Sequence, residues 1–408
     1  MRILYLSQYF PPEVGATQTR AYEMATGLIR AGHQVTMLTE VPNHPEGIIR
    51  PGYRGRFWIR EKVKAIDVIR VWVRTSPVKT MRTRLAFYLS YMINATLAGL
   101  LVARGHYDLL YATSPPLFVG AAALALSHLR RTPMVFEVRD LWPQSAVALG
   151  ELSNPRLIRW ATWLEERCYQ RSRRIVVVTQ GIRDRLLQRG IEPQKINLIP
   201  NGANTELFHP RPQAGRQLRD ELGLAGHFLV IYAGIHGIAQ GLEHVLKAAQ
   251  QLVDAPHIHF VFVGDGPCKE ELLDMKHGLG LGNVTMIEAQ PREAIPAFLS
   301  AADVALVPLR RLDLFKDALP SKMFDAWACA CPTVLSIEGE AHRVLQQAEA
   351  GVFVPPEAPR ALATALLDLS RDRQRCRTHG LNGRRFVEKN YSRQAQARQL
   401  THLLEATL

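Results

Sequence analysis

Short apolar runs recur along this chain, and each is followed by a segment long enough to form a helix. In the first half the runs occupy residues 2–7, 34–39, 68–73, 109–112, 134–138 and 175–179. A second series occupies residues 228–233, 259–263, 284–288, 304–306 and 333–335. Strand, helix and strand at this spacing is the pattern of parallel α/β units. We therefore predict two Rossmann-like, doubly wound parallel sheets.

The two series are separated by the turn-rich stretch Pro200-Asn201-Gly202 and by a polar segment over residues 209–226. A chain of 408 residues is long for one compact core, so two domains are the simplest arrangement. We place them at residues 1–204 and 205–390. Ligands bind beyond the carboxyl ends of the strands in such sheets, which predicts a site in a cleft where the two sheets face each other.

Cysteine usage bears on the compartment and on metal binding. The five cysteines are scattered and do not form the paired motifs of metal sites or secreted disulfide frameworks. The apolar run at the start of the chain is too short for a signal peptide. We expect a cytoplasmic protein with no metal and no cofactor.

Four segments of the second half resemble glycosyltransferase family 4 when taken in order. They are Ile199-Pro-Asn-Gly-Ala-Asn-Thr-Glu-Leu-Phe208, Tyr232-Ala-Gly-Ile-His-Gly-Ile-Ala-Gln-Gly-Leu242, Val284-Thr-Met-Ile-Glu-Ala-Gln-Pro-Arg-Glu293 and Asp317-Ala-Leu-Pro-Ser-Lys-Met-Phe-Asp325. The Pro-Ser-Lys form of the last segment resembles a sub-branch of WbuB-type N-acetyl-L-fucosamine transferases. The resemblance implies the GT-B fold, in which two such domains face each other, and a terminal helix, here about residues 391–408, that packs back onto the first domain.

The resemblance places a donor nucleotide sugar in the second domain. Asp317 is expected to accept hydroxyl hydrogens of the donor sugar, and Asp325 those of the ribose. If a helix starts near Ser321, a good N-cap residue, its amides and Lys322 face the diphosphate. The backbone of Leu319 and Pro320 completes this segment. Two solvated acids beside a helix start are the plain alternative for the Asp-x7-Asp spacing alone.

The remaining donor candidates come from the other three segments and depart from the family pattern. Gly234 permits a close backbone approach after a strand, while His236 and Gln240 stand near the places of the family's usual arginine and lysine. Ala289 and Gln290 are expected against the base, where Glu288 replaces a usual glycine. Both usual glutamates of the donor motif are the shorter aspartates, which leaves the base and the sugar open.

The first half carries the resemblance in Tyr9-Phe-Pro-Pro-Glu-Val-Gly-Ala16 and in Phe136-Glu-Val-Arg-Asp-Leu-Trp-Pro143. In the family the loop at Gly15 and Ala16 closes over the donor phosphates, and a His-Asp pair corresponds to Arg139-Asp140 here. We predict that Arg139 stabilises the departing diphosphate, with a structural salt bridge to Asp140 or Glu137 as the alternative. Glu13 is an acceptor-side candidate by position, with a surface-loop residue as the equal alternative.

Positive charge is concentrated in the first half. The net charge is +13, and residues 50–84 contain 11 basic side chains and two acids. An uncharged stretch over residues 85–103 follows, for which we predict a buried or half-buried helix rather than a spanning one. We expect residues 50–106 to contact an anionic membrane surface peripherally, and the absence of a recognition module argues against nucleic acid.

Together these features and the resemblance predict a retaining transfer from a nucleotide diphosphate sugar to a polyprenyl-diphosphate-linked saccharide in O-antigen, capsule or exopolysaccharide assembly. Uridine is the expected base of the donor. N-acetyl-L-fucosamine is the sugar that the sub-branch suggests. Two alternatives stay open: a UDP-sugar 2-epimerase of the same fold, and a non-catalytic protein that binds membranes or polyanions.

Overall fold

The computed structural model describes residues 1–13, 15–44, 46–78, 80–148, 150 and 152–408, so Val14, Pro45, Lys79, Leu149 and Glu151 lie outside the description. The chain divides into two compact units. Unit 1 comprises Met1–Pro200 and Gln394–Leu408, and unit 2 comprises Asn201–Arg393. The division thus falls at residues 200 and 393, beside the sequence-based limits of 204 and 390.

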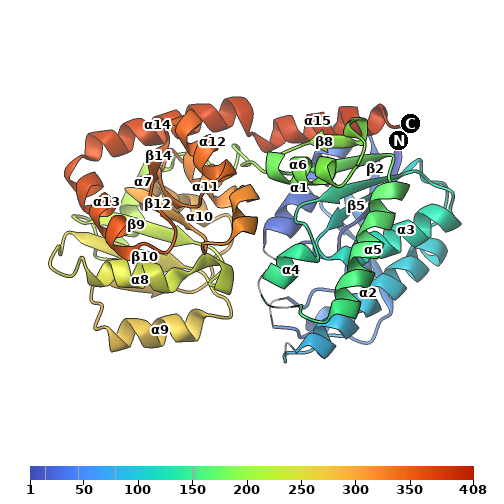
Figure 1. Ribbon diagram of the computed structural model, residues 1–408, viewed down its shortest axis with the longest axis horizontal. Coiled ribbons are helices and arrows are strands. Elements are labelled where there is room, and N and C mark those ends of the chain that lie inside the picture. Colours follow the sequence, from blue (N-terminus) through green and yellow to red (C-terminus); the bar gives the residue numbers. More distant parts are fainter. Residues whose placement is uncertain (14, 45, 79, 149, 151) are drawn as a thin grey trace. The chain divides into compact units, whose positions relative to one another are not determined.

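Unit 1 is built on an eight-stranded sheet in the order β3-β4-β2-β1-β5-β6-β7-β8; Figure 1 labels its strands β2, β5 and β8. Its strands are β1 (Arg2–Leu6), β2 (Gln34–Glu40), β3 (Trp58–Val63), β4 (Ile66–Val71), β5 (Leu109–Ser114), β6 (Met134–Val138), β7 (Arg174–Val177) and β8 (Ile196–Leu198). Its helices are α1 (Ala16–Arg30), α2 (Met81–Leu101), α3 (Leu117–Leu129), α4 (Gln144–Ala148), α5 (Pro155–Arg171), α6 (Gln180–Gln188) and most of α15 (Arg393–Glu405). Short 3₁₀ turns lie at Pro51–Tyr53 and Pro193–Lys195.

Alternate side chains of the strands of unit 1 serve two cores, one on each face of the sheet. Leu4 and Leu6 of β1 contribute to the core beneath α2, α3, α5 and α6. Ile3 and Tyr5 contribute to the opposite core, which is covered by α1 and by Ala397, Leu400 and Leu404 of α15. Both faces are therefore buried, as a parallel sheet requires.

Unit 2 has a six-stranded, fully parallel sheet in the order β11-β10-β9-β12-β13-β14; Figure 1 labels its strands β9, β10, β12 and β14. Its strands are β9 (Phe228–Ala233), β10 (Ile258–Val263), β11 (Val284–Ile287), β12 (Val304–Pro308), β13 (Thr333–Ser336) and β14 (Gly351–Phe353). Its helices are α7 (Pro212–Glu221), α8 (Leu242–Gln250), α9 (Lys269–Gly278), α10 (Ile295–Ala301), α11 (Ser321–Ala328), α12 (Glu340–Ala348), α13 (Pro359–Arg371) and α14 (Arg373–Asn390), with 3₁₀ turns η3 (Ile238–Gln240) and η4 (Asp313–Asp317).

The uncharged stretch over residues 85–103 forms most of α2, whose first turn is closed by reciprocal hydrogen bonds between Thr80 and Thr83. Tyr91 and Ala95 face the core, whereas Ile93 and Leu97 are about half exposed, at 52% and 49%. The prediction of a half-buried helix is confirmed. In the described part of the chain, no helix combines the length and the apolar character needed to cross a bilayer.

Candidate active site

The donor motif lies in unit 2 across a short turn and the start of a helix. Asp317 ends η4, and Asp325 lies one turn inside α11. The helix begins at Ser321 as predicted, but the prediction that Ser321 caps it is wrong, because the N-cap position belongs to Pro320. Proline has no side-chain acceptor, and no described side chain caps this end. The backbone N–H of Met323 already donates to the Pro320 carbonyl at 3.3 Å, so the N–H groups of Ser321 and Lys322 are the ones this helix start can offer to an anionic ligand.

Lys322, in the first turn of α11, reaches back toward the end of β9. Its Nζ donates a hydrogen bond to the Tyr232 hydroxyl at 2.8 Å and lies 4.2 Å from the centre of that ring. The Tyr232 hydroxyl in turn donates to the carbonyl of Ile235 at 2.6 Å. Burial lowers the pKa of Lys322 to about 7, although Asp325 acts in the opposite direction. A ligand phosphate here would meet a cation whose charge depends on pH.

The loop after β9 is shaped by glycines. A Cβ at Gly234 would lie 2.7 Å from Lys322 Nζ, and the φ of Gly234 is +149°. A Cβ at Gly264, after β10, would lie 2.0 Å from the Gly234 carbonyl oxygen. The two loops therefore pack backbone against backbone at the carboxyl ends of β9 and β10. This is the edge of the sheet where ligands of such folds bind.

His236 occupies the centre of this packing and is fully buried. Burial first, and then the positive charges of Lys269 and Lys322, lower its pKa to about 4, while Asp265 acts against them. Both ring nitrogens lack a hydrogen-bond partner among the described residues. His236 is therefore neutral at pH 7 and offers a ligand no positive charge.

Lys269 is a cation near this edge that the sequence reasoning missed. It begins α9, is buried, and its Nζ donates to the carbonyl oxygens of Gly264 and Ile287 at 3.0 and 3.4 Å. Its Nζ also lies 3.7 Å from Glu288 Oε1. A lysine at the first position of a helix that follows the Gly-Asp-Gly-Pro turn was the signal available in the sequence.

The other predicted donor residues of unit 2 are more dispersed. Leu319 is buried in the core, so only its backbone can reach a ligand, and its carbonyl already accepts from Asn201 Nδ2 at 3.3 Å. Ala289 is exposed, and the side chain of Gln290 folds back onto the Glu288 carbonyl at 3.2 Å. Gln240 ends η3 and lines a separate small hollow.

In unit 1, Glu13 is not a surface-loop residue, so that alternative is wrong. It is 4% exposed, and its Oε1 accepts hydrogen bonds from the backbone N–H groups of Asn43 and His44, each at 2.7 Å. Burial raises the pKa of Glu13, against the effect of these two bonds. Glu13 thus holds the loop after β2 in place. Gly15 precedes α1, which Ala16 begins.

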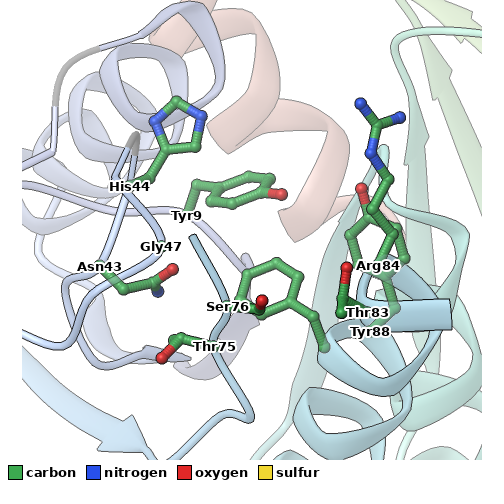
Figure 2. A pocket seen from close by; sticks show the side chains of 10 residues that line it. Tyr9, Asn43, His44, Gly47, Thr75, Ser76, Thr83, Arg84 and Tyr88 are labelled. Atoms are coloured by element: carbon green, nitrogen blue, oxygen red, sulfur yellow. The ribbon is translucent and has the colours of Figure 1, made fainter. Parts of the chain in front are cut away.

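The polar loops of unit 1 surround an open pocket (Figure 2). Residues that follow β1, β2 and β4 line it together with the first turns of α2, so it lies at the carboxyl edge of the sheet. Figure 2 shows the side chains of Tyr9, His44, Arg84 and Tyr88 around this space. Its lining is Tyr9, Asn43, His44, Gly47, Thr75, Ser76, Thr83, Arg84, Phe87 and Tyr88.

Arg139 and Asp140 follow β6 at the same edge of the unit 1 sheet. The ion-pair partner of Glu137 is Arg20, with Nε and Oε1 at 2.8 Å and both side chains buried. Tyr111 and Thr113 also donate to this carboxylate. Burial raises the pKa of Asp140. Hydrogen bonds from the Ser145 side chain and the Leu141 amide act in the opposite direction.

The predicted site residues therefore fall into two sets. Unit 2 brings Gly234, His236 and Lys322 together, with Asp317 and Asp325 on the same motif. Glu13, Gly15, Ala16, Arg139 and Asp140 belong to unit 1. The catalytic roles assigned to Arg139 and Asp140 stay predictions. No group of metal-binding side chains occurs among the described residues.

Two protein-family models match successive parts of the chain. Residues 15–202 match the glycosyl transferase 4-like domain, and residues 216–405 match glycosyl transferases group 1. Over 376 residues the chain is 25% identical to WcaI of Escherichia coli K12, which is named as a colanic acid biosynthesis glycosyl transferase, covering 90% of this chain and 91% of WcaI.

Two further comparisons concern a more partial relative and a solved structure. The chain is 28% identical over 210 residues to a GDP-mannose-dependent α-(1-6)-phosphatidylinositol monomannoside mannosyltransferase of Mycolicibacterium smegmatis, covering 50% of this chain and 55% of that protein. The crystal structure of Anabaena HepE in complex with UDP-glucose matches the fold with a TM-score of 0.74 at 18% identity, covering 100% of both chains.

Proposed function

This chain belongs to glycosyltransferase family 4 and has the GT-B fold, and from that premise we propose that it moves a sugar from a nucleotide diphosphate sugar to a lipid-linked saccharide, with retention of configuration, in surface polysaccharide assembly. A UDP-linked N-acetylated deoxyhexosamine is the proposed donor. The names of WcaI and of the mannosyltransferase support polysaccharide and glycolipid chemistry. The bound UDP-glucose of HepE supports a uridine nucleotide.

One observation carries the donor site. Lys322 Nζ, the uncapped amides of α11 and the glycine loop after β9 converge at one edge of the unit 2 sheet. Cation, helix start and close backbone approach are the elements that hold a diphosphate without a metal ion. We propose that Asp317 binds the donor sugar and Asp325 the ribose, with the backbone of Ala289 and Gln290 against the base.

The donor site is tested by thermal stabilisation with UDP-, GDP-, ADP- and dTDP-sugars. We expect one of them to raise the melting temperature of the wild type, and Lys322→Ala to remove most of that increase. Lys247→Ala is the matched control, because Lys247 is an exposed lysine on α8 of the same unit. If no sugar nucleotide stabilises the wild type, or if Lys322→Ala responds as the wild type does, the proposed site is wrong.

The lipid-linked acceptor is proposed from the charge of unit 1. Arg50, Arg54, Arg56 and Arg60 are exposed in the segment that precedes α2, and each cation near an anionic surface contributes about 1 kcal/mol. Arg70 does not contribute, because it is 1% exposed and its Nε bonds to Glu61 Oε1. Lys79 lies outside the described residues.

The acceptor half of the proposal has its own test. Charge reversal at Arg54, Arg56 and Arg60 should weaken binding to vesicles of phosphatidylglycerol and phosphatidylcholine, and added salt should weaken the binding of the wild type. If neither the charge reversal nor added salt weakens vesicle binding, a membrane role for this segment is refuted. Turnover of the sugar nucleotide without any acceptor would point to the epimerase alternative instead.

A further inference from the structure

Helix α5 of unit 1 carries two stripes of opposite character. Ala161, Leu164 and Cys168 recur at helical spacing and are buried in the core beneath α5. A second stripe recurs at intervals of three and four residues, which places its members on one outward side of the helix. This docking face consists of Arg156, Arg159, Trp160, Trp163 and Arg167.

The two tryptophans of the docking face are unusually open to solvent for indole side chains. Trp160 is 41% exposed and Trp163 is 50% exposed. The guanidinium of Arg167 lies 5.6 Å from the centre of the Trp163 ring. Single exposed apolar residues are ordinary, but two adjacent indoles flanked by arginines form an amphipathic surface.

The charge of the docking face is positive along its length. Arg156 and Arg159 are exposed before the tryptophans, and Arg167 follows them. The neighbouring acid Glu166 has Oε1 3.6 Å from Arg189, which follows α6 and also pairs with Glu165 at 2.7 Å. Indoles with arginines on either side are suited to the boundary between lipid headgroups and acyl chains, where the arginines meet lipid phosphates.

A row of ring contacts joins this face to the pocket of Figure 2. Trp160 lies 5.7 Å from Phe118 at the start of α3, measured between ring centres. Phe118 stacks on Tyr88 of α2 at 5.7 Å, and Tyr88 lies 5.4 Å from Phe87. Phe87 and Tyr88 both line the pocket, and Figure 2 labels Tyr88. The wall of the pocket and the docking face are thus joined by a row of packed rings that passes through the buried Phe118.

We propose that the docking face of α5 seats unit 1 on an anionic phospholipid bilayer. The proposal rests on the lipid-linked acceptor proposed above and adds a surface remote in sequence from residues 50–106. Charge complementarity selects the occupant: cations attract anionic headgroups, and the indoles enter the headgroup boundary. The ring contacts then connect the bilayer side of the unit to the pocket, where Arg84 and hydroxyl side chains can meet a phosphosugar headgroup.

Vesicle binding tests the proposal with the full-length protein. The probe is a vesicle of phosphatidylglycerol and phosphatidylcholine in equal parts, compared with phosphatidylcholine alone. The double change Arg156→Gln and Arg159→Gln should weaken binding about 30-fold, at about fivefold for each cation. The double change Trp160→Ser and Trp163→Ser should weaken it about tenfold or more.

The matched control lies on α14 of unit 2, where Arg377 and the 53% exposed Leu381 have the same four-residue spacing. The double change Arg377→Gln and Leu381→Ser should leave vesicle binding unchanged. Equal losses in the control and in the α5 variants would show that overall charge governs binding, and would overturn the docking face. A change of oligomeric state in the tryptophan variant would assign the face to a second copy of the chain and overturn it as well.

Quenching by brominated phosphatidylcholine separates insertion from misfolding. The double change Trp160→Phe and Trp163→Phe, made in a Trp58→Phe background because Trp58 is also 55% exposed, should keep vesicle binding but lose most of the bromine quenching of that background. Unchanged quenching would place these indoles away from the lipid and refute the proposal. Stabilisation by a sugar nucleotide should persist in every α5 variant, because the donor site belongs to unit 2.

Thermal stabilisation by a sugar nucleotide distinguishes failure of the docking face from failure of the proposed donor site. A wild type that is stabilised by a sugar nucleotide but does not bind the vesicles refutes the docking face and leaves the transferase proposal standing. A wild type that no sugar nucleotide stabilises refutes the donor proposal, whatever the vesicles show.

Discussion

The charge of Lys322 should make donor binding depend on pH in a calculable way. In the free protein burial lowers the pKa of Lys322 to about 7. A bound diphosphate places negative charge beside the ammonium and favours its protonated form. Donor binding should therefore take up a proton above pH 7. Affinity should be highest below pH 7 and fall as pH rises through the free-state pKa.

The magnitude follows from linkage between proton and donor binding. If Lys322 stays protonated in the complex, affinity falls by a factor of about 30 between pH 6 and pH 8.5, which is about 2 kcal/mol. His236 and Tyr232, which face Lys322, do not change their charge between pH 6 and pH 8.5. The pKa of His236 is lowered to about 4, and burial raises the pKa of the Tyr232 phenol far above the interval. Asp325 opposes the lowering at Lys322 itself.

Calorimetric titration with the best stabilising sugar nucleotide would measure the effect, in buffers of different ionisation enthalpy so that proton uptake is counted directly. Lys322→Arg keeps a positive charge throughout and should bind with little dependence on pH, because arginine does not titrate in this range. The Lys322→Met variant should bind the sugar nucleotide weakly, with the same affinity at pH 6 and at pH 8.5. A wild type with constant affinity and no proton uptake would refute the reasoning, as would Lys322→Met with the wild-type slope.

Two predictions concern the scaffold. Glu137→Ala should lower the free energy of unfolding by about 3–5 kcal/mol, because it removes the carboxylate that pairs with the buried Arg20. A loss below about 1 kcal/mol in urea titration would contradict the pairing. Gly380→Ala should cost about 1–3 kcal/mol, because its Cβ would lie 2.0 Å from the Ala330 carbonyl oxygen. Gly226→Ala, with open space around its Cβ, is the control and should stay within about 0.5 kcal/mol of the wild type; equal melting temperatures for the two variants would contradict the packing.

Most strands could be predicted because both faces of a parallel sheet are buried, so each strand is a continuous apolar run. The eleven predicted runs agree with the strands to within two residues at either end. Strands β3, β8 and β14 were missed. The last two have three residues each, and the residues of β3 explain why it was missed. Trp58–Val63 pairs antiparallel at the edge of the sheet and alternates exposed with partly buried side chains, including Arg60 and Lys62. Such a pattern has no apolar run to detect.

The candidate donor site was only partly accessible to sequence reasoning. Lys322 and the start of α11 could be placed because helix-start signals are local. The partner of Lys322 could not be placed, because Tyr232 is 90 positions away along the chain. The same holds for Arg20 and Glu137, which are separated by 117 positions. Contacts of this kind depend on which strand ends meet, and a single sequence carries no signal for that.

In unit 1, the number of basic residues in a segment overstates the positive charge that the segment exposes to solvent. Arg70 belongs to the basic segment by sequence, yet it is buried and bonded to Glu61. From the sequence, α5 was predicted only as a helix-length segment between two strands. Its sequence nevertheless contains the stripe at Ala161, Leu164 and Cys168 that is buried in the core. Once that stripe is assigned to the core, helical geometry forces Trp160 and Trp163 outward. The exposed indoles were therefore implicit in the spacing, and what the structure adds is their aromatic connection to the pocket.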